Sequence, residues 1–399
     1  MLHVVTPEKA LQIISETVTV LHRTEPVSLE NALGRIAGED ILSPEDLPAF
    51  DRSTVDGYAV MAKDTYGCSE SIPAMLLYDG EILMGERPSR SLEDGHCLRI
   101  STGGSLPPGS DAVSMIEYTD DMGDEFRYIY KPVSPLENVN RQGDDIQKGS
   151  IAVKKGDVIS ARSIAVLSAL GVSRISAALQ VRIGILSTGD ELVEYSMKPE
   201  GAQIRNINSA MLAAQVQEAG ALPVVYPIIK DELSLLCAAL KKALAECDMV
   251  LISGGSSVGE KDNTHQVLEM LGQVLFHGIS IKPGKPTIYA TVNGKPVFGL
   301  PGHPQAAYFI FRLFGVPCLR RLMGSNVQSI FVQRLLSDNI PSNHGREEVL
   351  PVMISESAAI PLHSKSGAVS VLSRADGYIR IPRDTEGLKK GSPVTVFLF

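Results

Sequence analysis

The spacing of apolar positions predicts a helix at the start of the chain and short strands after it. Thr6 followed by Pro7 is a typical helix start, and apolar residues then recur at helical spacing from Ala10 to Val18. From about residue 25 to 180, short apolar runs are broken by turns such as Pro107-Pro108-Gly109. We therefore expect an N-terminal helix that leads into mostly β structure.

The pattern changes after residue 181, where apolar runs alternate with helical stretches. Apolar runs typical of buried strands lie at 181–186, 223–229, 249–252, 287–291 and 296–300. Helical spacing predicts helices at about 208–218, 232–246 and 264–271, and another from Pro304 to about Met323. Alternating strands and helices predict right-handed crossovers and a largely parallel sheet with helices on both faces. Ligands of such sheets sit beyond the carboxyl ends of the strands.

Short alternating runs return after the last helix, for example from Gly377 to Pro382. They predict a small C-terminal β domain of the barrel kind. A chain of 399 residues also exceeds the roughly 250 to 300 residues at which a single core stops growing. The expected fold class is therefore α/β plus β, in several domains.

The net charge and the cysteine spacing indicate which kinds of partner and metal site the protein is expected to lack. The net charge is -9 and no block of Lys or Arg is present, which argues against a nucleic-acid partner held by phosphate neutralisation. The five cysteines show no CxxC spacing, so neither a zinc site nor a full disulfide set is expected. We find no signal sequence and no apolar run that could span a membrane, and we expect a cytoplasmic protein.

Two predicted strands end in turns that carry acidic or small polar residues. The turn from Ser187 to Leu192 places two carboxylates after a glycine, and carboxylates at a strand exit suit a hard cation such as Mg²⁺. An acid-rich helix N-terminus explains this motif equally well. The turn from Ser253 to Gly259 is rich in Gly and Ser, whose backbone N–H groups and hydroxyls can hold a phosphate. It is not a Walker A motif, and an ordinary glycine-rich turn remains the alternative.

Basic residues gather in one stiff turn of this acidic chain. Lys282 and Lys285 flank Pro283-Gly284, and Pro286 follows, so two ammonium groups stand on a restrained backbone. A solvated surface turn is the alternative. The run from Gly299 to Pro304 ends a nearby predicted strand, and Pro304 can begin a helix whose N-terminus attracts an anion.

The β-rich region contributes polar turns around glycine. Asp56-Gly57 and Thr102-Gly103 belong to two such turns, and Gly143-Asp144-Asp145 forms an acidic one. Physical chemistry alone does not separate these from ordinary Asx-type turns.

In this order, the motifs resemble those of the molybdopterin molybdenumtransferase family, which includes the bacterial MoeA proteins and the E domain of gephyrin. The resemblance runs over nearly the whole chain. It implies a homodimer with four domains per chain, at 1–24 plus 173–328, 25–41 plus 148–172, 42–147 and 329–399. These would be the molybdopterin-binding α/β domain, an extended β linker, a mostly β domain that reaches the partner subunit, and the C-terminal β-barrel.

The resemblance also implies a reaction and its residues. Adenylylated molybdopterin and molybdate, with a divalent cation such as Mg²⁺, would give molybdenum cofactor and AMP. Implied catalytic residues are Asp56, Thr102, Asp145 and Glu191, and implied metal ligands are Glu191, Asp231 and Asp262. Implied substrate-binding residues are Ser253, Gly254, Gly255, Ser257, Gly259, Lys282, Lys285, Pro301, Gly302, Pro304 and Ser366. Asn140, Gly278 and His303 stand where other members often have different residues.

Three other functions stay open at this point. A paralogue could bind the pterin as a scaffold without turnover, or deliver tungstate in place of molybdate. An adenylyltransferase that acts one step earlier would share the α/β domain. Other cofactor-biosynthesis proteins and recipient apoenzymes are expected partners.

Overall fold

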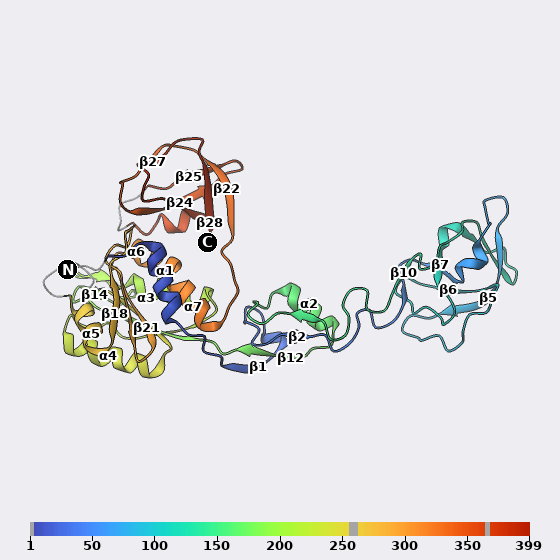
Figure 1. Ribbon diagram of the computed structural model, residues 1–399, viewed down its shortest axis with the longest axis horizontal. Helices are drawn as coiled ribbons and strands as arrows, with labels where there is room; N and C mark the ends of the chain where they lie inside the picture. The colour runs from blue at the N-terminus through green and yellow to red at the C-terminus, as the bar shows by residue number, and fades with distance from the viewer. Residues whose placement is uncertain (1–3, 255–261, 364–367) are drawn as a thin grey trace.

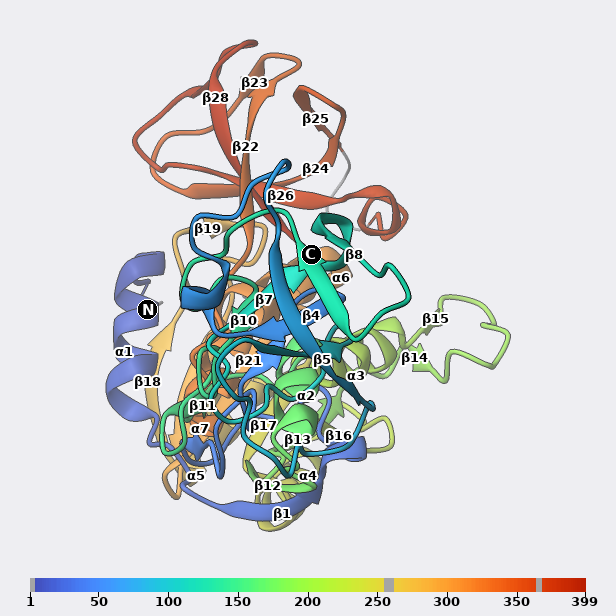
Figure 2. The same cartoon turned by 90° about the vertical axis from the view of Figure 1, so that its right-hand side faces the viewer.

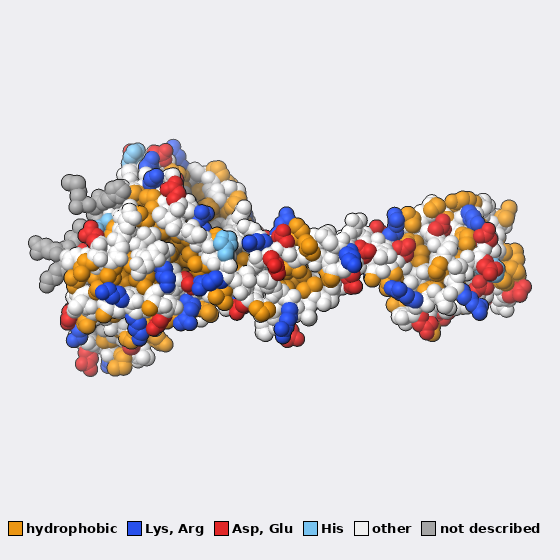
Figure 3. Space-filling model, turned by 60° about the horizontal axis from the view of Figure 1, so that its bottom comes forward, with side chains coloured by type: hydrophobic (Ala, Val, Ile, Leu, Met, Phe, Trp, Pro, Cys, Tyr) orange, Lys and Arg blue, Asp and Glu red, His pale blue; other side chains and the backbone are white. Residues whose placement is uncertain are grey.

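The computed structural model describes residues 4–254, 262–363 and 368–399. Figure 1 shows an elongated molecule, with two bulky parts at one end, a slim middle part and a separate β domain at the other end. Acidic and basic side chains are interspersed over the face in Figure 3, with no continuous basic band on that face. Among the described residues, no helix is long and apolar enough to cross a membrane.

A six-stranded sheet forms the centre of the α/β part, in the order β16-β13-β17-β21-β20-β18. Its pairs are parallel from β16 to β21, and the last two pairs are antiparallel. The largely parallel sheet expected from the sequence is therefore confirmed, although the edge strand β18 was not predicted. The strands are β13 (Arg182–Ser187), β16 (Leu222–Val225), β17 (Met249–Ser253), β18 (Gln273–His277), β20 (Ile288–Val292) and β21 (Lys295–Leu300).

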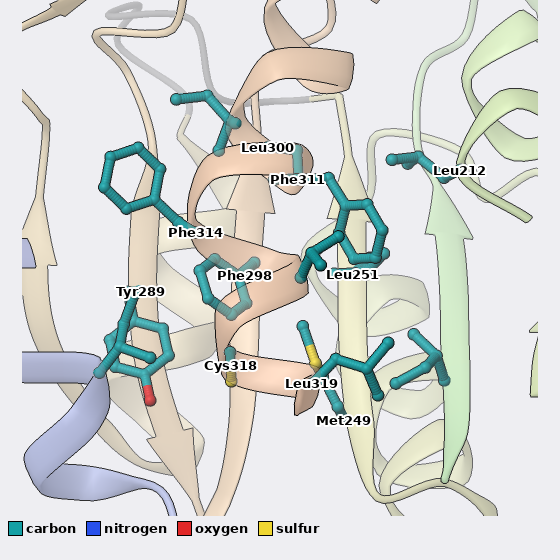
Figure 4. Packing of buried hydrophobic residues seen from close by; sticks show 14 of the residues in the cluster. Leu212, Met249, Leu251, Tyr289, Phe298, Leu300, Phe311, Phe314, Cys318 and Leu319 are labelled. Carbon is teal, nitrogen blue, oxygen red and sulfur yellow. The ribbon is translucent and has the colours of Figure 1, made fainter. Parts of the chain in front are cut away.

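Helices cover both faces of this sheet because its central strands are apolar on both sides. Along β17, Met249 and Leu251 join one buried cluster, whereas Val250 and Ile252 join the other. Figure 4 shows the first cluster, where Phe311 and Leu319 lie over the sheet residues Leu251 and Phe298. The helices on that face are α1 (Pro7–Thr17), α3 (Ile207–Glu218), α6 (Pro304–Ile310) and α7 (Val316–Met323), and those on the other are α4 (Leu233–Glu246) and α5 (Asn263–Leu271).

The helix expected from Pro304 to Met323 is divided by a π-helical turn at Phe311–Gly315. Pro317 has no N–H, so the regular bond to the carbonyl of Leu313 cannot form. The N–H of Val316 instead donates to the carbonyl of Phe311, five residues earlier. The helix axis continues through this turn, but the extra residue in the π-helical turn shifts the side-chain positions of α7 relative to those of α6.

The slim middle part consists of two antiparallel passes of the chain. β1 (Thr24–Ser28) pairs with β12 (Arg174–Ala178), β2 (Ile41–Leu42) pairs with β11 (Ile151–Val153), and α2 (Ala161–Ala169) packs against them. The chain thus leaves along one strand of each pair and returns along the other, which carries the distal β domain away from the α/β part (Figure 1).

The distal domain is a six-stranded sheet in the order β7-β4-β6-β5-β9-β8. A short pair, β3 (Arg52–Ser53) with β10 (Val139–Asn140), lies where the chain enters and leaves it. The strands of the sheet are β4 (Gly57–Val60), β5 (Ala74–Ile82), β6 (His96–Ile100), β7 (Ala112–Met115), β8 (Thr119–Asp120) and β9 (Phe126–Ile129).

The C-terminal domain is a closed barrel, as expected. Its strands pair in a ring, β24-β25-β22-β28-β26, and β26 returns to β24. The short strand β19 (Ile281–Lys282) extends from the α/β part and pairs with β24. The barrel strands are β22 (Phe331–Leu336), β24 (Glu347–Ile354), β25 (Ala358–Pro361), β26 (Gly377–Ile381) and β28 (Pro393–Leu398), with a side pair of β23 (Ile340–Pro341) and β27 (Gly387–Leu388). The exact domain boundaries stay a prediction.

Candidate active site

A cleft of about 1070 Å³ opens beyond the carboxyl ends of the parallel strands. This is the edge where ligands of open α/β sheets are expected. Seven of the site residues that the family resemblance implies line it: Glu191, Asp231, Ser253, Gly254, Pro301, Gly302 and Pro304. They come from four separate stretches of chain, so the fold brings together what the sequence keeps apart.

The two carboxylates of the cleft are held by the turn after β13. Thr188 Oγ1 donates to Asp231 Oδ1 at 2.6 Å, which fixes the direction of that side chain. The Glu191 carboxylate folds back over Gly189, where a Cβ atom would lie 2.8 Å from Glu191 Oε2. Glycine at 189 therefore leaves room for this carboxylate. Two carboxylates in one cleft suit Mg²⁺, which often takes one or two protein carboxylates and completes its shell with water and substrate phosphate.

The third predicted metal ligand, Asp262, has structural partners. It caps α5, where its Oδ1 accepts from the backbone N–H of His265 at 3.0 Å, and its Oδ2 lies 3.4 Å from His277 Nε2. The rings of His265 and His277 stack at 4.5 Å, and burial lowers the pKa of His277. Asn263 Nδ2 donates to the backbone carbonyl of Asp231, which holds the start of α5 beside the cleft. Among the described residues, no three His, Cys, Asp or Glu side chains gather as a metal cluster.

Gly254 follows β17 with φ of 109°, a region that favours glycine. A Cβ at this position would collide with the backbone carbonyl of Thr188. The turns after β13 and β17 therefore pack against each other without an intervening side chain, and this close approach defines the floor of the cleft.

Asn208, which the sequence reasoning did not single out, connects three walls of the cleft. Its side chain is 7% exposed, and Nδ2 donates to Ser253 Oγ and to the carbonyl of Gly302, both at 2.8 Å. Asn206, two residues earlier, caps α3 and accepts from the N–H of Ser209. In the sequence, Asn206 and Asn208 stand at a helix start, where Asn is common as a cap, so they gave no separate signal.

Lys282 and Lys285 line a neighbouring cavity of about 440 Å³ between the α/β part and the barrel. This cavity shares Pro286, Pro301 and His303 with the cleft, so the two spaces adjoin. Lys282 Nζ lies 2.8 Å from Glu348 Oε1, a residue of the barrel strand β24. The lysine turn therefore faces the cleft region, as the sequence suggested, but from the barrel side.

Asp56, Thr102 and Asp145 lie outside the cleft of their own chain. Asp56 and Thr102 belong to the distal domain, and Thr102 donates to Asp56 Oδ1 through both its backbone N–H and its hydroxyl. The backbone bond is the main reason that the pKa of Asp56 is lowered. Asp145 is exposed near the base of that domain, where its N–H donates to the carbonyl of Leu47. Figure 1 shows how far the distal domain stands from the α/β part.

Four of the predicted substrate-binding residues, Gly255, Ser257, Gly259 and Ser366, lie outside the described residues. Their assignments stay predictions.

Comparisons with known proteins agree with this architecture. Family models described as "MoeA N-terminal region (domain I and II)", "Probable molybdopterin binding domain" and "MoeA C-terminal region (domain IV)" match residues 5–171, 184–321 and 333–399. A molybdopterin molybdenumtransferase of Bacillus subtilis is 34% identical, over 94% of this chain and 90% of its own length. The chain belongs to the molybdopterin molybdenumtransferase family.

Solved structures of the family have the same fold. A molybdopterin biosynthesis MoeA protein of Pyrococcus horikoshii OT3 superposes with a TM-score of 0.90 at 32% identity, over 99% of this chain and 100% of that one. A second Pyrococcus horikoshii structure gives 0.85 at 39% identity, over 99% of both chains. The family and fold class predicted from the sequence are confirmed, and the chain is an enzyme of molybdenum cofactor biosynthesis.

Proposed function

We propose that this enzyme inserts molybdenum from molybdate into adenylylated molybdopterin, with release of AMP and formation of molybdenum cofactor. The observation that carries the proposal is the meeting of two carboxylates, Glu191 and Asp231, with the Ser253-Gly254 turn in one cleft. A lysine-lined cavity adjoins it. A phosphorylated pterin and an oxyanion need sites for negative charge, and breaking a phosphoanhydride is helped by a cation held on carboxylates.

Each group of residues has a proposed role. Glu191 and Asp231, which line the cleft, would hold a divalent cation, Mg²⁺ by donor chemistry, and Glu191 would also orient the attacking oxygen. Asp262, the third ligand expected from the resemblance, caps α5 and does not gather with these two carboxylates in the described part of the chain, so it is left out of the proposed cation site. The cation would supply charge neutralisation at the phosphoanhydride. The serine-glycine turn, at Ser253, Gly254, Gly255, Ser257 and Gly259, would hold phosphate by backbone N–H groups and hydroxyls.

The remaining residues would bind and enclose the substrates. Lys282 and Lys285, with Ser366, would bind the oxyanion and phosphate at the barrel side of the cleft. Pro301, Gly302 and Pro304 would shape the pocket wall that precedes α6. The fixed contacts of Asn208 with Ser253 and Gly302 support this reading, since they keep two substrate-binding turns at a constant separation.

We further propose that the active enzyme is a homodimer whose sites are shared between subunits. Asp56, Thr102 and Asp145 are absent from the described lining of their own cleft. An elongated chain can present such residues to the cleft of a second copy around a two-fold axis. The Asp56 carboxylate, ionised and held by Thr102, would then complete the partner's site.

The test is release of AMP. Purified enzyme, adenylylated molybdopterin, molybdate and Mg²⁺ should release AMP, and chelation of the cation with EDTA should stop the release. Absence of AMP from substrate shown to be intact would contradict the proposal. Consumption of ATP with unmodified molybdopterin would instead identify an adenylyltransferase.

A further inference from the structure

The described lining of the cleft carries more negative than positive charge. Glu191 and Asp231 are both acidic, and Arg205 is the single Lys or Arg side chain among the lining residues that the structure describes. A phosphate group is repelled by carboxylates unless a cation lies between or beside them. Of the two lysines that line the adjoining cavity, Lys282 already faces Glu348 at 2.8 Å, so its charge is partly balanced.

Arg205 is held in place by the loop that it closes. We call residues 192–205 the arm, which begins at β14 (Leu192–Val193) and ends at β15 (Ile204–Arg205), two strands that pair in parallel. Arg205 Nε donates to the carbonyls of Tyr195 and Met197, both at 3.1 Å. Figure 2 shows the arm projecting from the side of the α/β part.

These contacts use one of the five N–H groups of the guanidinium. The four N–H groups on its two terminal nitrogens stay directed away from the Nε bonds by the planar geometry of the group. Over the described part of the chain, Arg205 forms no ion pair with an acidic side chain. A guanidinium that is fixed through Nε and open at its other end is suited to bind an anion in a two-pronged manner.

The surroundings of Arg205 suit an anion attached to a flat ring. Ile204 and Ile207 line the same wall of the cleft, and they are 53% and 37% exposed. α3 begins at Ile207, so the positive end of its dipole faces this wall as well. Exposed isoleucines beside a fixed guanidinium offer one surface for an apolar ring face and one for a charged substituent.

We propose that Arg205 binds a phosphate group of the substrate, and that Ile204 of the arm and Ile207 of α3 contact its heteroaromatic ring. This inference rests on the proposed function and adds a substrate-binding residue to it. Arg205 acts in binding, so its loss should raise the substrate KM more than it lowers kcat.

The experiment measures binding of two simple probes, AMP and inorganic pyrophosphate, by titration calorimetry in the presence of Mg²⁺. The variants are Arg205→Gln, which removes the charge, and Arg205→Lys, which keeps it. Lys198→Gln is the matched control, because Lys198 is an exposed cation of the same arm that does not line the cleft. Circular dichroism and the melting temperature report whether each variant is folded.

We expect the wild-type enzyme to bind at least one probe, and Arg205→Gln to weaken this binding about tenfold or more, the effect of one charge-assisted hydrogen bond or more. Arg205→Lys should lose less, and Lys198→Gln should bind like the wild type. Equal affinity in Arg205→Gln and wild type, or no binding of either probe by the wild type, would overturn the proposal.

AMP release tests the proposed function independently of this binding experiment. Phosphate binding that depends on Arg205, without turnover of adenylylated molybdopterin, would refute the proposed reaction and leave the binding role intact. Turnover by Arg205→Gln with an unchanged KM would refute the role of Arg205 and leave the reaction intact.

Discussion

Thr102 donates two hydrogen bonds to a single carboxylate oxygen of Asp56. The backbone N–H lies 2.7 Å from Asp56 Oδ1 and the hydroxyl lies 3.0 Å from it. The backbone bond is the largest cause that lowers the pKa of Asp56, and the hydroxyl bond is the next. Both bonds stabilise the charged form, so Asp56 keeps its charge to lower pH than a free aspartate.

This arrangement predicts the effect of Thr102→Val on the pH dependence of AMP release. Valine removes the hydroxyl bond and leaves the backbone bond, so the pKa of Asp56 should rise part of the way to its ordinary value. If the reaction needs ionised Asp56, the acid limb of the rate profile should move to higher pH. Thr102→Ser keeps the hydroxyl and serves as the control. If the acid limbs of Thr102→Val and the wild type are identical, the reaction does not depend on the ionisation of Asp56.

A shared site between subunits predicts complementation by two inactive variants. Glu191→Gln removes a carboxylate of the cleft, and Asp56→Asn removes one of the distal domain, so each homodimer should lose most of its activity. A random mixture contains heterodimers with one intact site each. Refolded or coexpressed mixtures should therefore recover about one quarter of wild-type activity per subunit.

The complementation experiment has an internal control. In a heterodimer of Glu191→Gln with Asp231→Asn, each subunit lacks one carboxylate of its own cleft, so such heterodimers contain no intact site. If the mixture of Glu191→Gln and Asp56→Asn recovers no activity, Asp56 either acts in the cleft of its own chain or takes no part in the reaction. Light scattering on the wild type measures the dimer itself.

Close contact at Gly254 predicts a large cost for a small substitution. Gly254→Ala adds a Cβ that collides with the carbonyl of Thr188, at a residue whose φ is 109°. The free energy of unfolding should fall by about 3 kcal/mol or more, because strain and collision act together. Gly201→Ala is the control, since Gly201 has φ of 59° but no atom within 4 Å of the added Cβ. It should cost about 1 kcal/mol. Chemical denaturation measures both, and equal values would contradict the packing described here.

The sequence predicted the α/β elements well because their signals are local. Thr6-Pro7 marks the start of α1, and the structure confirms Thr6 as its cap. Apolar runs such as 249–252 became buried strands of the sheet. β18 was missed although its centre is apolar, because Val274-Leu275-Phe276 is a run of only three residues that follows closely after α5. The π-helical turn was not predicted, because it depends on Pro317 within an otherwise regular helical pattern.

The sequence motifs singled out Glu191 and the Ser253-Gly254 turn, which line the cleft, because each motif carries its own chemistry, whereas Asp231 was named only through the family resemblance. Asn208 and Arg205 were missed for a physical reason. Their roles come from tertiary contacts, with the carbonyl of Gly302 for Asn208 and with the carbonyls of the arm for Arg205. Asn208 bonds to a residue 94 positions away, and Arg205 bonds to carbonyls 8 and 10 positions earlier in an irregular loop. Neither contact follows from a periodic sequence pattern.

The central claim is that pterin adenylate cleavage is coupled to metal insertion. The most direct measurement follows AMP by chromatography and pterin-bound molybdenum by mass spectrometry in one reaction, for the wild type and for Glu191→Gln. We predict that the wild type forms AMP and molybdenum-loaded pterin one for one when molybdate and Mg²⁺ are both present, and that Glu191→Gln forms little of either. AMP without bound molybdenum, or neither product from intact substrate, would contradict the account.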